Sequence, residues 1–502
     1  MGKNVIVIGA GAAGLMAAAA AAENGNSVTV LEKNEKAGKK IYITGKGRCN
    51  LTNDCATEDF FGHVVRNHKF LYSAVYGFDH DRVKEFFEKN GCPVKVERGN
   101  RVFPVSDHAS DVTAALVRRL SRLGARILYH TEAMEILTEP AEEPETDVSV
   151  RRVSGVRLRG GRVMPADAVI LCTGGLSYPS TGSTGDGLKM AEKAGLSVIP
   201  AAPSLVPFET KEQWCRDLQG LALKNTAIRV FPIEETEDSL MPSGEAPAAS
   251  GDPDAAEGLR SSASGDPDAA EGLQSSVSGD PDASERSQST ASGDPVLQGG
   301  RQTKKGGKNK KRKKEKLVYE AFGELLFTHF GLSGPVILTA SCYCDFERYP
   351  QGFRLFMDLK PALSQEQLVE RIRREFSEAP NRHLPGAVRP LFPARLAEAV
   401  TELSGLGTDR RAAAFTQAEI EGLASLIKKI PVTITGTRGF TEAIITRGGI
   451  SVKEFNPSTM ECRTIRGLFA AGEVLDVDAH TGGFNLQIAW STGYLAGSSV
   501  CV

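Results

Sequence analysis

The first 32 residues of this 502-residue chain contain the feature that most constrains its fold. An apolar run, Val5 to Ile8, leads into an alanine-rich stretch with glycines at fingerprint spacing (Gly9, Gly11, Gly14), and a second apolar run ends at Glu32. This order predicts a strand, a tight turn, a helix and a second strand. The glycines permit the turn, the approach of a pyrophosphate and close helix packing. The pattern predicts a dinucleotide site with its phosphates at the helix N-terminus and a ribose at Glu32.

The same uncharged run, Val5 to Ala22, could also be read as a signal peptide or a membrane span. The glycine spacing and the immediate return to a β-rich run ending at Glu32 favour the dinucleotide site. Because the first core strand begins within a few residues of Met1, we expect no removable leader and no membrane span. The nine scattered cysteines form no paired CxxC pattern, and the net charge is −2. We therefore expect a cytoplasmic protein and no metal site.

The length predicts more than one domain, and the composition changes along the chain. The expected fold class is α/β, with a discontinuous Rossmann-like domain over residues 1–200 and 432–502. We expect a β-rich insert over 201–234 and 317–360. A helical insert is expected over 361–431, because its apolar residues recur with helical period until Pro431.

Residues 235–316 differ from the rest of the chain. The tetrad SGDP recurs every 14 residues from Ser250 to Ser292, and a basic run follows from Lys304 to Lys316. These repeats contain almost nothing apolar to bury, so we expect a disordered linker. The basic run alone is typical of nucleic-acid binding. A solvated tether that partly neutralises the acidic repeat is the favoured interpretation.

Four more glycine-rich segments punctuate the chain: residues 38–53, 173–187, 446–449 and 467–497. The second follows a buried apolar run, Ala168 to Cys172, so its loop is expected at the carboxyl edge of the sheet, where ligands bind in α/β proteins. The last contains an apolar run into Gly472 and a glycine pair before a terminal helix from Asn485 to Gly497.

At these motifs the chain resembles a known family. GKKIYITGKGRCNLTN, GELLFTHFGLSGP, TRGG and GEVLDVDAHTGGFNLQIAWSTG are similar to the YhiN-like flavoproteins, also called aminoacetone-oxidase-like or bile-acid-inducible N type FAD-dependent oxidoreductases. The resemblance spans the chain except residues 235–316. It implies a two-dinucleotide-fold flavoprotein whose discontinuous FAD domain carries a β-rich and a helical insert.

The resemblance also implies which residues hold FAD. The glycine fingerprint and Glu32 would bind the pyrophosphate and adenosine ribose, Glu473 replaces the usual aspartate near the ribityl chain, and the dipole of the last helix would stabilise the reduced ring. The implied cofactor-binding residues are Gly9, Ala10, Gly11, Ala12, Ala13, Gly14, Glu32, Lys33, Lys40, Arg48, Cys49, Asn50, Thr173, Gly174, Gly175, Gly472, Glu473, Gly483, Phe484 and Asn485.

Two variants of flavin chemistry can be weighed from the residues. Cys49 and Cys55 enclose five residues rather than the four of a redox-active disulfide, so Cys49 is expected to pack near the ring. Only one dinucleotide fingerprint is visible, so NAD(P)H, as transient electron donor, is expected to visit the same flavin face as the substrate. The candidate proton donors are Tyr178, His329, Arg438 and His480, with the two histidines favoured because they titrate near neutral pH.

The resemblance implies reduction of a carbon–carbon double bond in a hydrophobic small molecule, such as a 3-oxo-Δ4 or Δ4,6 bile-acid or steroid intermediate, by hydride transfer from flavin N5. Three alternatives stay open. One is a flavin amine oxidase using oxygen, and another is a non-catalytic flavoprotein whose basic run binds RNA. The third is a flavin-dependent tRNA-modifying enzyme, for which we see no dedicated RNA-recognition element.

Overall fold

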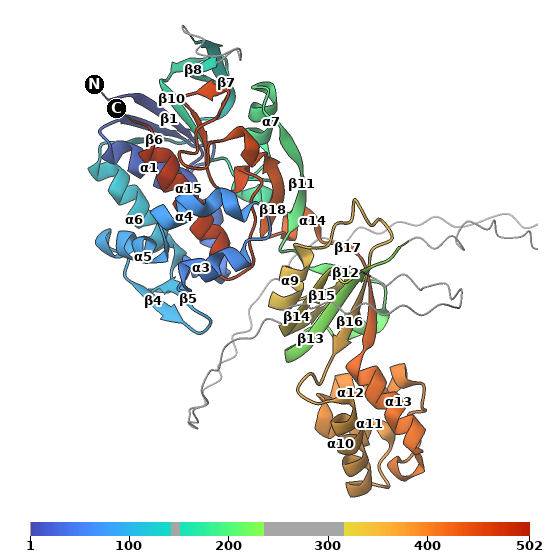
Figure 1. Cartoon of the computed structure of the whole chain (residues 1–502). Coiled ribbons are helices and arrows are strands. Elements are labelled where there is room, and N and C mark those ends of the chain that lie inside the picture. The colour runs from blue at the N-terminus through green and yellow to red at the C-terminus, as the bar shows by residue number, and fades with distance from the viewer. Residues whose placement is uncertain (1, 142–150, 235–315, 502) are drawn as a thin grey trace, which may run out of the picture. The chain divides into compact units, whose positions relative to one another are not determined.

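The computed structural model describes residues 2–141, 151–234 and 316–501. A parallel sheet has the order β20-β10-β1-β2-β6 (Figure 1). Its strands are Leu468–Ala470, Ala168–Leu171, Asn4–Ile8, Ser27–Leu31 and Arg126–Leu128. Strands β1 and β10 are almost fully buried, as expected for parallel strands covered on both faces. The predicted Rossmann-like sheet is therefore confirmed, with the N-terminal β1 and the C-terminal β20 on either side of β10.

The first and last helices, α1 (Ala12–Glu23) and α15 (Phe484–Ser498), pack against each other (Figure 1). Both are apolar on nearly all sides. Alanines on α1 and glycines on α15 allow an unusually close approach: a methyl group at Gly493 would lie 2.5 Å from the carbonyl oxygen of Ala13. This contact joins the N-terminal fingerprint to the C-terminal segment that the sequence also placed at the cofactor.

Shorter elements surround the sheet. Helices α2 (Lys39–Ile43), α3 (Thr57–Phe60), α4 (Tyr72–Gly77) and α5 (His80–Lys89) follow β2, and α6 (Ala109–Arg122) precedes β6. A three-stranded sheet has the order β3-β5-β4 (Thr52–Asn53, Arg101–Pro104, Val94–Glu97). A second small sheet contains β7 (Ala133–Pro140), β8 (Arg151–Leu158), β9 (Val163–Pro165) and β19 (Ile465–Arg466). Helix α7 (Asp186–Lys193) precedes the antiparallel pair β11 (Val198–Ser204) and β18 (Ile445–Ile450).

The β-rich insert is a closed barrel with the order β12-β15-β14-β13-β16-β17. Its strands are Phe208–Thr210, Gly331–Ser333, Tyr319–Thr328, Ala222–Pro232, Phe353–Asp358 and Ile430–Thr437. Short helices α8 (Gln213–Asp217), α9 (Pro335–Ser341) and α14 (Gly439–Glu442) accompany it. Because β17 closes the barrel, the barrel extends to Thr437, whereas the sequence placed the return to the nucleotide domain at residue 432.

The helical insert contains α10 (Gln365–Glu378), α11 (Leu384–Val388), α12 (Ala394–Ser404) and α13 (Gln417–Lys428). Helices α10 and α13 each begin with a capping box, Ser364 with Gln367 and Thr416 with Glu419, which satisfies N–H groups at both helix starts. The apolar faces of these helices share one buried cluster with the barrel. The predicted disorder and tether role of residues 235–316 concern a segment that, up to residue 315, lies outside the described residues.

Candidate cofactor and active site

A cavity of about 680 Å³ lies at the carboxyl ends of β1, β2 and β10. One end is lined by Glu32 and by residues 131–133. The other is lined by residues 43–46, 48 and 50 and by residues 480–483, 485 and 486. The volume is within the range of cofactor sites. The site therefore collects segments from the N-terminal, central and C-terminal parts of the chain, as the distributed glycine motifs predicted.

The glycine turn forms an open cradle at the start of α1. Gly11 is the N-cap residue and carries no side-chain cap, so the first N–H groups of the helix have no partner within it. A methyl group at Gly11 would meet no protein atom within 4 Å, whereas one at Gly14 would lie 1.9 Å from the carbonyl oxygen of Gly9. Gly14 thus serves packing, and Gly11 leaves room for a ligand. This arrangement fits a pyrophosphate.

Glu32 is buried and held in one orientation at the end of β2. Its Oε2 accepts from the backbone N–H of Ala10 at 2.9 Å, and its Oε1 accepts from the backbone and side chain of Asn34 at 2.9 and 2.7 Å. The carboxylate also lines the cavity. Its position fits the predicted hydrogen bonding to a ribose.

The opposite end of the cavity has features that fit a flavin. Helix α15 starts at Gly483 without a side-chain cap, so its first N–H groups are open to a ligand. Asn50 lines the cavity, and its buried Oδ1 has no hydrogen-bond partner among the described residues. A buried orphan acceptor is costly unless a ligand donor satisfies it, and the imide N–H of a flavin is such a donor. FAD therefore fits both ends of the cavity.

A partly buried network connects these four glycine-rich segments, 38–53, 173–187, 446–449 and 467–497. Glu473 Oε1 accepts from Ser177 Oγ at 2.6 Å and from the backbone N–H of Thr446 at 2.9 Å, and Lys40 Nζ lies 2.7 Å from Glu473 Oε2. Thr446 Oγ1 in turn accepts from the backbone N–H groups of Leu176 and Ser177, at 2.8 and 3.0 Å. The Glu473 carboxylate therefore fixes the loop that follows β10.

Tyr178 lies next in this loop and lines the cavity. Its φ of 51° is in the left-handed region, which bulky residues rarely adopt, and its N–H donates to the Phe440 carbonyl at 3.0 Å. Burial and the nearby Glu442 carboxylate raise the pKa of the phenol, so it keeps its proton at neutral pH. Within the described part of the chain its hydroxyl has no hydrogen-bond partner. Tyr178, with its phenol protonated, is thus held in the cavity lining by a constrained backbone.

His480 lines the cavity, but its ionisation differs from the sequence prediction. Its Nε2 lies 2.8 Å from the hydroxyl of Tyr343 and its Nδ1 lies 3.3 Å from Nδ1 of His63. Burial, with a smaller contribution from His63, lowers the pKa of His480 to about 4. The expectation that His480 donates a proton because it titrates near neutral pH is therefore wrong. At neutral pH the ring is uncharged.

The other two predicted proton donors lie outside the cavity lining. His329 is exposed in the turn between β14 and β15. The guanidinium of Arg438 is bonded to Glu442 and Glu209, at 2.9 and 3.1 Å, and lies over the ring of Phe330. Sequence reasoning grouped these residues with the site because each lies in a glycine-rich loop or a family motif, but neither lines the cavity.

The structure brings most of the predicted cofactor residues to the cavity. Those that line it are Gly9, Ala10, Gly11, Ala12, Ala13, Glu32, Lys33, Lys40, Arg48, Asn50, Thr173, Gly174, Glu473, Gly483 and Asn485. Those outside the lining are Gly14, Cys49, Gly175, Gly472 and Phe484. The second group supports the first through packing.

Some of the predicted cofactor-binding residues use their side chains to bond other parts of the protein. The Arg48 guanidinium is bonded to Glu97 and Asp107 and lies 4.1 Å from the Phe103 ring centroid. Asn485 bonds the backbone of Ala479 through both side-chain atoms, at 3.0 and 2.8 Å. These residues position the loops beside the cavity.

Cys49 is fully buried, and burial raises the pKa of its thiol to about 12. Cys49 and Cys55 are both free thiols. A thiolate at Cys49 is therefore not available near neutral pH, and the expected packing role agrees with its position.

Sequence reasoning missed residues that complete the site. Thr446 was quoted within TRGG but given no role, although it is buried and bonds the loop before Tyr178. Residues 131–133 line the Glu32 end of the cavity and carry no local motif, because they enter it only through the fold. The TRGG motif was a usable signal for Thr446.

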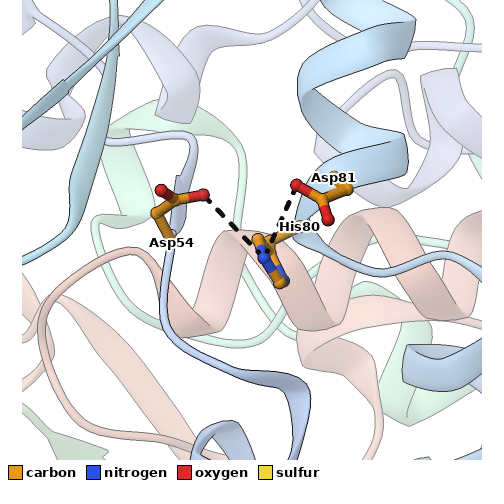
Figure 2. Close-up of side chains that lie close together, drawn as sticks. All are labelled: Asp54, His80 and Asp81. Carbon is orange, nitrogen blue, oxygen red and sulfur yellow. Dashed lines mark ion pairs between the residues drawn. The ribbon is translucent and has the colours of Figure 1, made fainter.

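A separate cluster, Asp54, His80 and Asp81, has the residue types of a metal site (Figure 2). His80 Nε2 lies 3.8 Å from Asp54 and 3.6 Å from Asp81. The ammonium of Lys84, however, bonds both carboxylates, at 2.8 Å for Asp81. A cation of the chain itself thus bonds both carboxylates of this cluster, and we assign no metal to it.

Comparison with known proteins fixes the family. The model of the HI0933-like protein Rossmann domain matches residues 3–499. The chain belongs to this HI0933-like family. The predicted YhiN-like relationship is thereby confirmed, and this HI0933-like protein is an FAD-dependent oxidoreductase. Within the described residues, no helix combines the length and apolar character needed to cross a membrane.

Three curated relatives match the HI0933-like chain over nearly its whole length. A "3-dehydro-bile acid delta(4,6)-reductase" of Clostridium scindens is 28% identical over 494 residues, covering 98% of this chain and 97% of the relative. A "Ribosomal RNA dihydrouridine synthase" of Haemophilus influenzae is 27% identical over 497 residues, covering 99% and 98%. A protein of the same description from Escherichia coli is 25% identical over 491 residues, covering 98% and 96%.

Proposed function

We propose that this protein reduces a carbon–carbon double bond conjugated to a carbonyl group in a hydrophobic enone, with NAD(P)H as electron donor. A 3-oxo-Δ4 or Δ4,6 bile-acid or steroid intermediate is the favoured substrate class. The observation that carries the proposal is the protonated, unpartnered hydroxyl of Tyr178 at a cavity that fits FAD. The name of the Clostridium scindens relative supports the same chemistry.

The reaction needs a hydride at the β-carbon of the enone and a proton at the α-carbon. Bound FAD supplies the hydride. Tyr178 holds the proton, and its raised pKa keeps that proton in place until negative charge develops on the α-carbon. The tyrosine then regains a proton from water. Overall, enone, NAD(P)H and one proton give the saturated carbonyl compound and NAD(P)⁺.

Apolar side chains line the cavity beside these groups. They include Ile43, Leu205, Ile444, Ile445 and Val477. Such a surface favours an apolar substrate body and excludes water from the reacting atoms. An amine oxidase would instead need an aromatic cage, and Phe103 and Tyr178 are the only phenyl-type rings among the described lining residues. The lining therefore favours an enone over an amine.

A single dinucleotide fingerprint at Gly9 to Gly14 implies that NAD(P)H and the enone use one cavity in turn. The enzyme would be reduced first, release NAD(P)⁺ and then bind the enone. This order predicts ping-pong kinetics, because neither ligand enters while the other is present.

Reduction of uridine in ribosomal RNA is the second candidate. It is favoured by the names of the relatives from Haemophilus influenzae and Escherichia coli. The C5=C6 bond of uracil is conjugated to the C4 carbonyl, so the same hydride and proton additions would reduce it. The basic run from Lys304 to Lys316 gives this chain a sequence with affinity for phosphates.

The two candidates are separated by product analysis. The FAD-loaded protein is incubated with NADH or NADPH and either 3-oxochol-4-en-24-oic acid or unmodified ribosomal RNA, and products are measured by mass spectrometry. We expect the saturated 3-oxo acid and no dihydrouridine. Dihydrouridine without steroid reduction would replace the first candidate with the second.

A further inference from the structure

Most cations that line the cavity are neutralised by a specific carboxylate. Lys33 is paired with Asp186 at 2.5 Å, Lys40 with Glu473 at 2.7 Å, and Lys39 with Glu35 at 3.3 Å. These pairs leave little net charge toward a ligand at the Glu32 end and the centre of the cavity.

The ion pairs near residues 43–50 form one shared cluster. The carboxylates of Glu97 and Asp107 are shared between Arg48 and Lys95. Two cations against two carboxylates leave no charge for another partner.

Lys46 and Arg101 remain as cations that line the cavity without a carboxylate partner among the described residues. Both are exposed. Arg101 uses Nε to donate to the Arg98 carbonyl at 3.1 Å, and its guanidinium carbon lies 5.7 Å from the Phe103 ring centroid. Two positive charges at one end of the cavity are therefore uncompensated.

Their positions relate them to the flavin end of the site. Arg101 pairs across β5 and β3 with Asn53, whose side chain donates to the Gly482 carbonyl at 3.1 Å, just before α15. Lys46 has a φ of 56° and follows Gly45, which also adopts the left-handed region. Non-glycine residues adopt this region only at an energetic cost. The turn thus places a charged side chain at a position where glycine would adopt the backbone conformation at lower energy.

Apolar surface adjoins the two cations. Ile43 also lines the cavity and is 43% exposed. The Phe103 ring centroid lies 4.1 Å from the guanidinium carbon of Arg48 and 5.7 Å from that of Arg101. Exposed isoleucine favours an apolar ligand body, whereas Lys46 and Arg101 favour an anion.

We propose that Lys46 and Arg101 bind the carboxylate of an amphipathic enone whose apolar body lies against Ile43 and Phe103. This inference rests on the proposed enone reductase function and assigns its substrate specificity: an apolar ring system with an anionic end. The two cations act on binding and take no part in the transfer of hydride or proton.

The test compares 3-oxochol-4-en-24-oic acid with its neutral methyl ester. Dissociation constants are measured from the flavin absorbance change on titration of the oxidised holoenzyme, so turnover is not required. Lys46→Gln, Arg101→Gln and the double variant are compared with Lys69→Gln, which removes one exposed cation outside the cavity lining.

We expect each single substitution to weaken binding of the acid about threefold and the double substitution about tenfold, the range of exposed charge pairs. Binding of the ester should change by less than about twofold, and Lys69→Gln should match the wild type. Salt should weaken the acid complex of the wild type and leave the ester complex unchanged, because screening acts on the charge pair.

If the Lys46 and Arg101 variants bound the acid and the ester with equally weakened affinity, or bound the acid as tightly as the wild type, the assignment would be overturned. Weaker binding of NADPH but not of NADH would assign the two cations to the nucleotide phosphate instead. Selective loss of acid binding without any reduction of the bound acid would preserve the anion site and refute the reductase function. Absence of binding of both steroids to the oxidised wild type would overturn the carboxylate assignment, whereas the reductase function is tested on the reduced enzyme.

Discussion

The hydroxyl of Ser177, the residue before Tyr178, donates a 2.6 Å hydrogen bond to the Glu473 carboxylate. Glu473 also bonds Lys40 and the backbone of Thr446. The loop that carries the candidate proton donor is thus fixed by residues from α2, β18 and the segment after β20. Because these residues lie far apart in the sequence, the geometry of the loop depends on several distant motifs at once.

Thr446 is expected to stabilise this loop through its hydroxyl. Thr446→Val keeps the shape but leaves the N–H groups of Leu176 and Ser177 without their acceptor, and each unsatisfied buried group costs about 1–3 kcal/mol. We therefore expect Thr446→Val to lower the free energy of unfolding by about 2–4 kcal/mol, measured by urea denaturation. Thr446→Ser keeps the acceptor and should cost about 1 kcal/mol or less. Equal stability of the two variants would argue against this role.

Tyr178 is expected to affect chemistry more than stability. Its hydroxyl has no partner in the described part of the protein, so Tyr178→Phe should change the free energy of unfolding by less than about 0.5 kcal/mol. Loss of a positioned proton donor should lower kcat/KM for the enone by about 10²–10⁴-fold. Reduction of the enzyme by NAD(P)H should proceed at the wild-type rate. Wild-type enone turnover in Tyr178→Phe would move the proton donor to another residue.

Gly11 and Gly14 should respond differently to the same added methyl group. At Gly11 the backbone is extended and the methyl group meets no protein atom, so Gly11→Ala should fold normally but crowd the cofactor. Crowding of about 1–3 kcal/mol corresponds to about a tenfold to hundredfold weaker Kd for FAD. Gly14→Ala should instead destabilise the protein, because the methyl group would lie 1.9 Å from a carbonyl oxygen.

These two variants are best compared by apoprotein Tm and by FAD fluorescence quenching. If the pyrophosphate lies at Gly11, Gly11→Ala should weaken FAD binding without lowering the Tm of the apoprotein. If Gly11→Ala bound FAD as tightly as the wild type, the pyrophosphate would have to lie elsewhere in the cavity.

His480 should make stability depend on pH between about 4 and 6.5. Burial lowers its pKa in the folded protein to about 4, below the usual value near 6.5 in the unfolded chain. In this window the unfolded chain takes up a proton that the folded protein does not, so stability falls as pH falls. His480→Gln removes this titration and should show a weaker pH dependence. Urea denaturation of both proteins between pH 4 and 7 measures the difference, and identical slopes would contradict the lowered pKa.

Much of this architecture follows from the sequence because its signals are local. The fingerprint at Gly9 to Gly14, the buried run Ala168 to Cys172 and the helical period of residues 364–430 each predict their elements without tertiary information. The N-cap residues Ser364 and Thr416 likewise mark two helix starts.

The failures have a tertiary origin. Arg438 and His329 lie in a glycine-rich loop and a family motif, but in the fold neither lines the cavity. The ionisation of His480 depends on burial beside His63 and Tyr343, which no local spacing encodes. Thr446 acts on residues about 270 positions earlier, so its motif was visible while its role was not.

The central claim, reduction of a conjugated double bond, is tested most directly by anaerobic half-reactions. The FAD-loaded protein is bleached with NADH or NADPH, and the reduced enzyme is then mixed with 3-oxochol-4-en-24-oic acid while flavin absorbance is followed. We predict that the flavin colour returns without oxygen and that one saturated 3-oxo acid forms per flavin. An enzyme that stays bleached in the presence of the enone, and regains its colour only when oxygen is admitted, would contradict the proposed function.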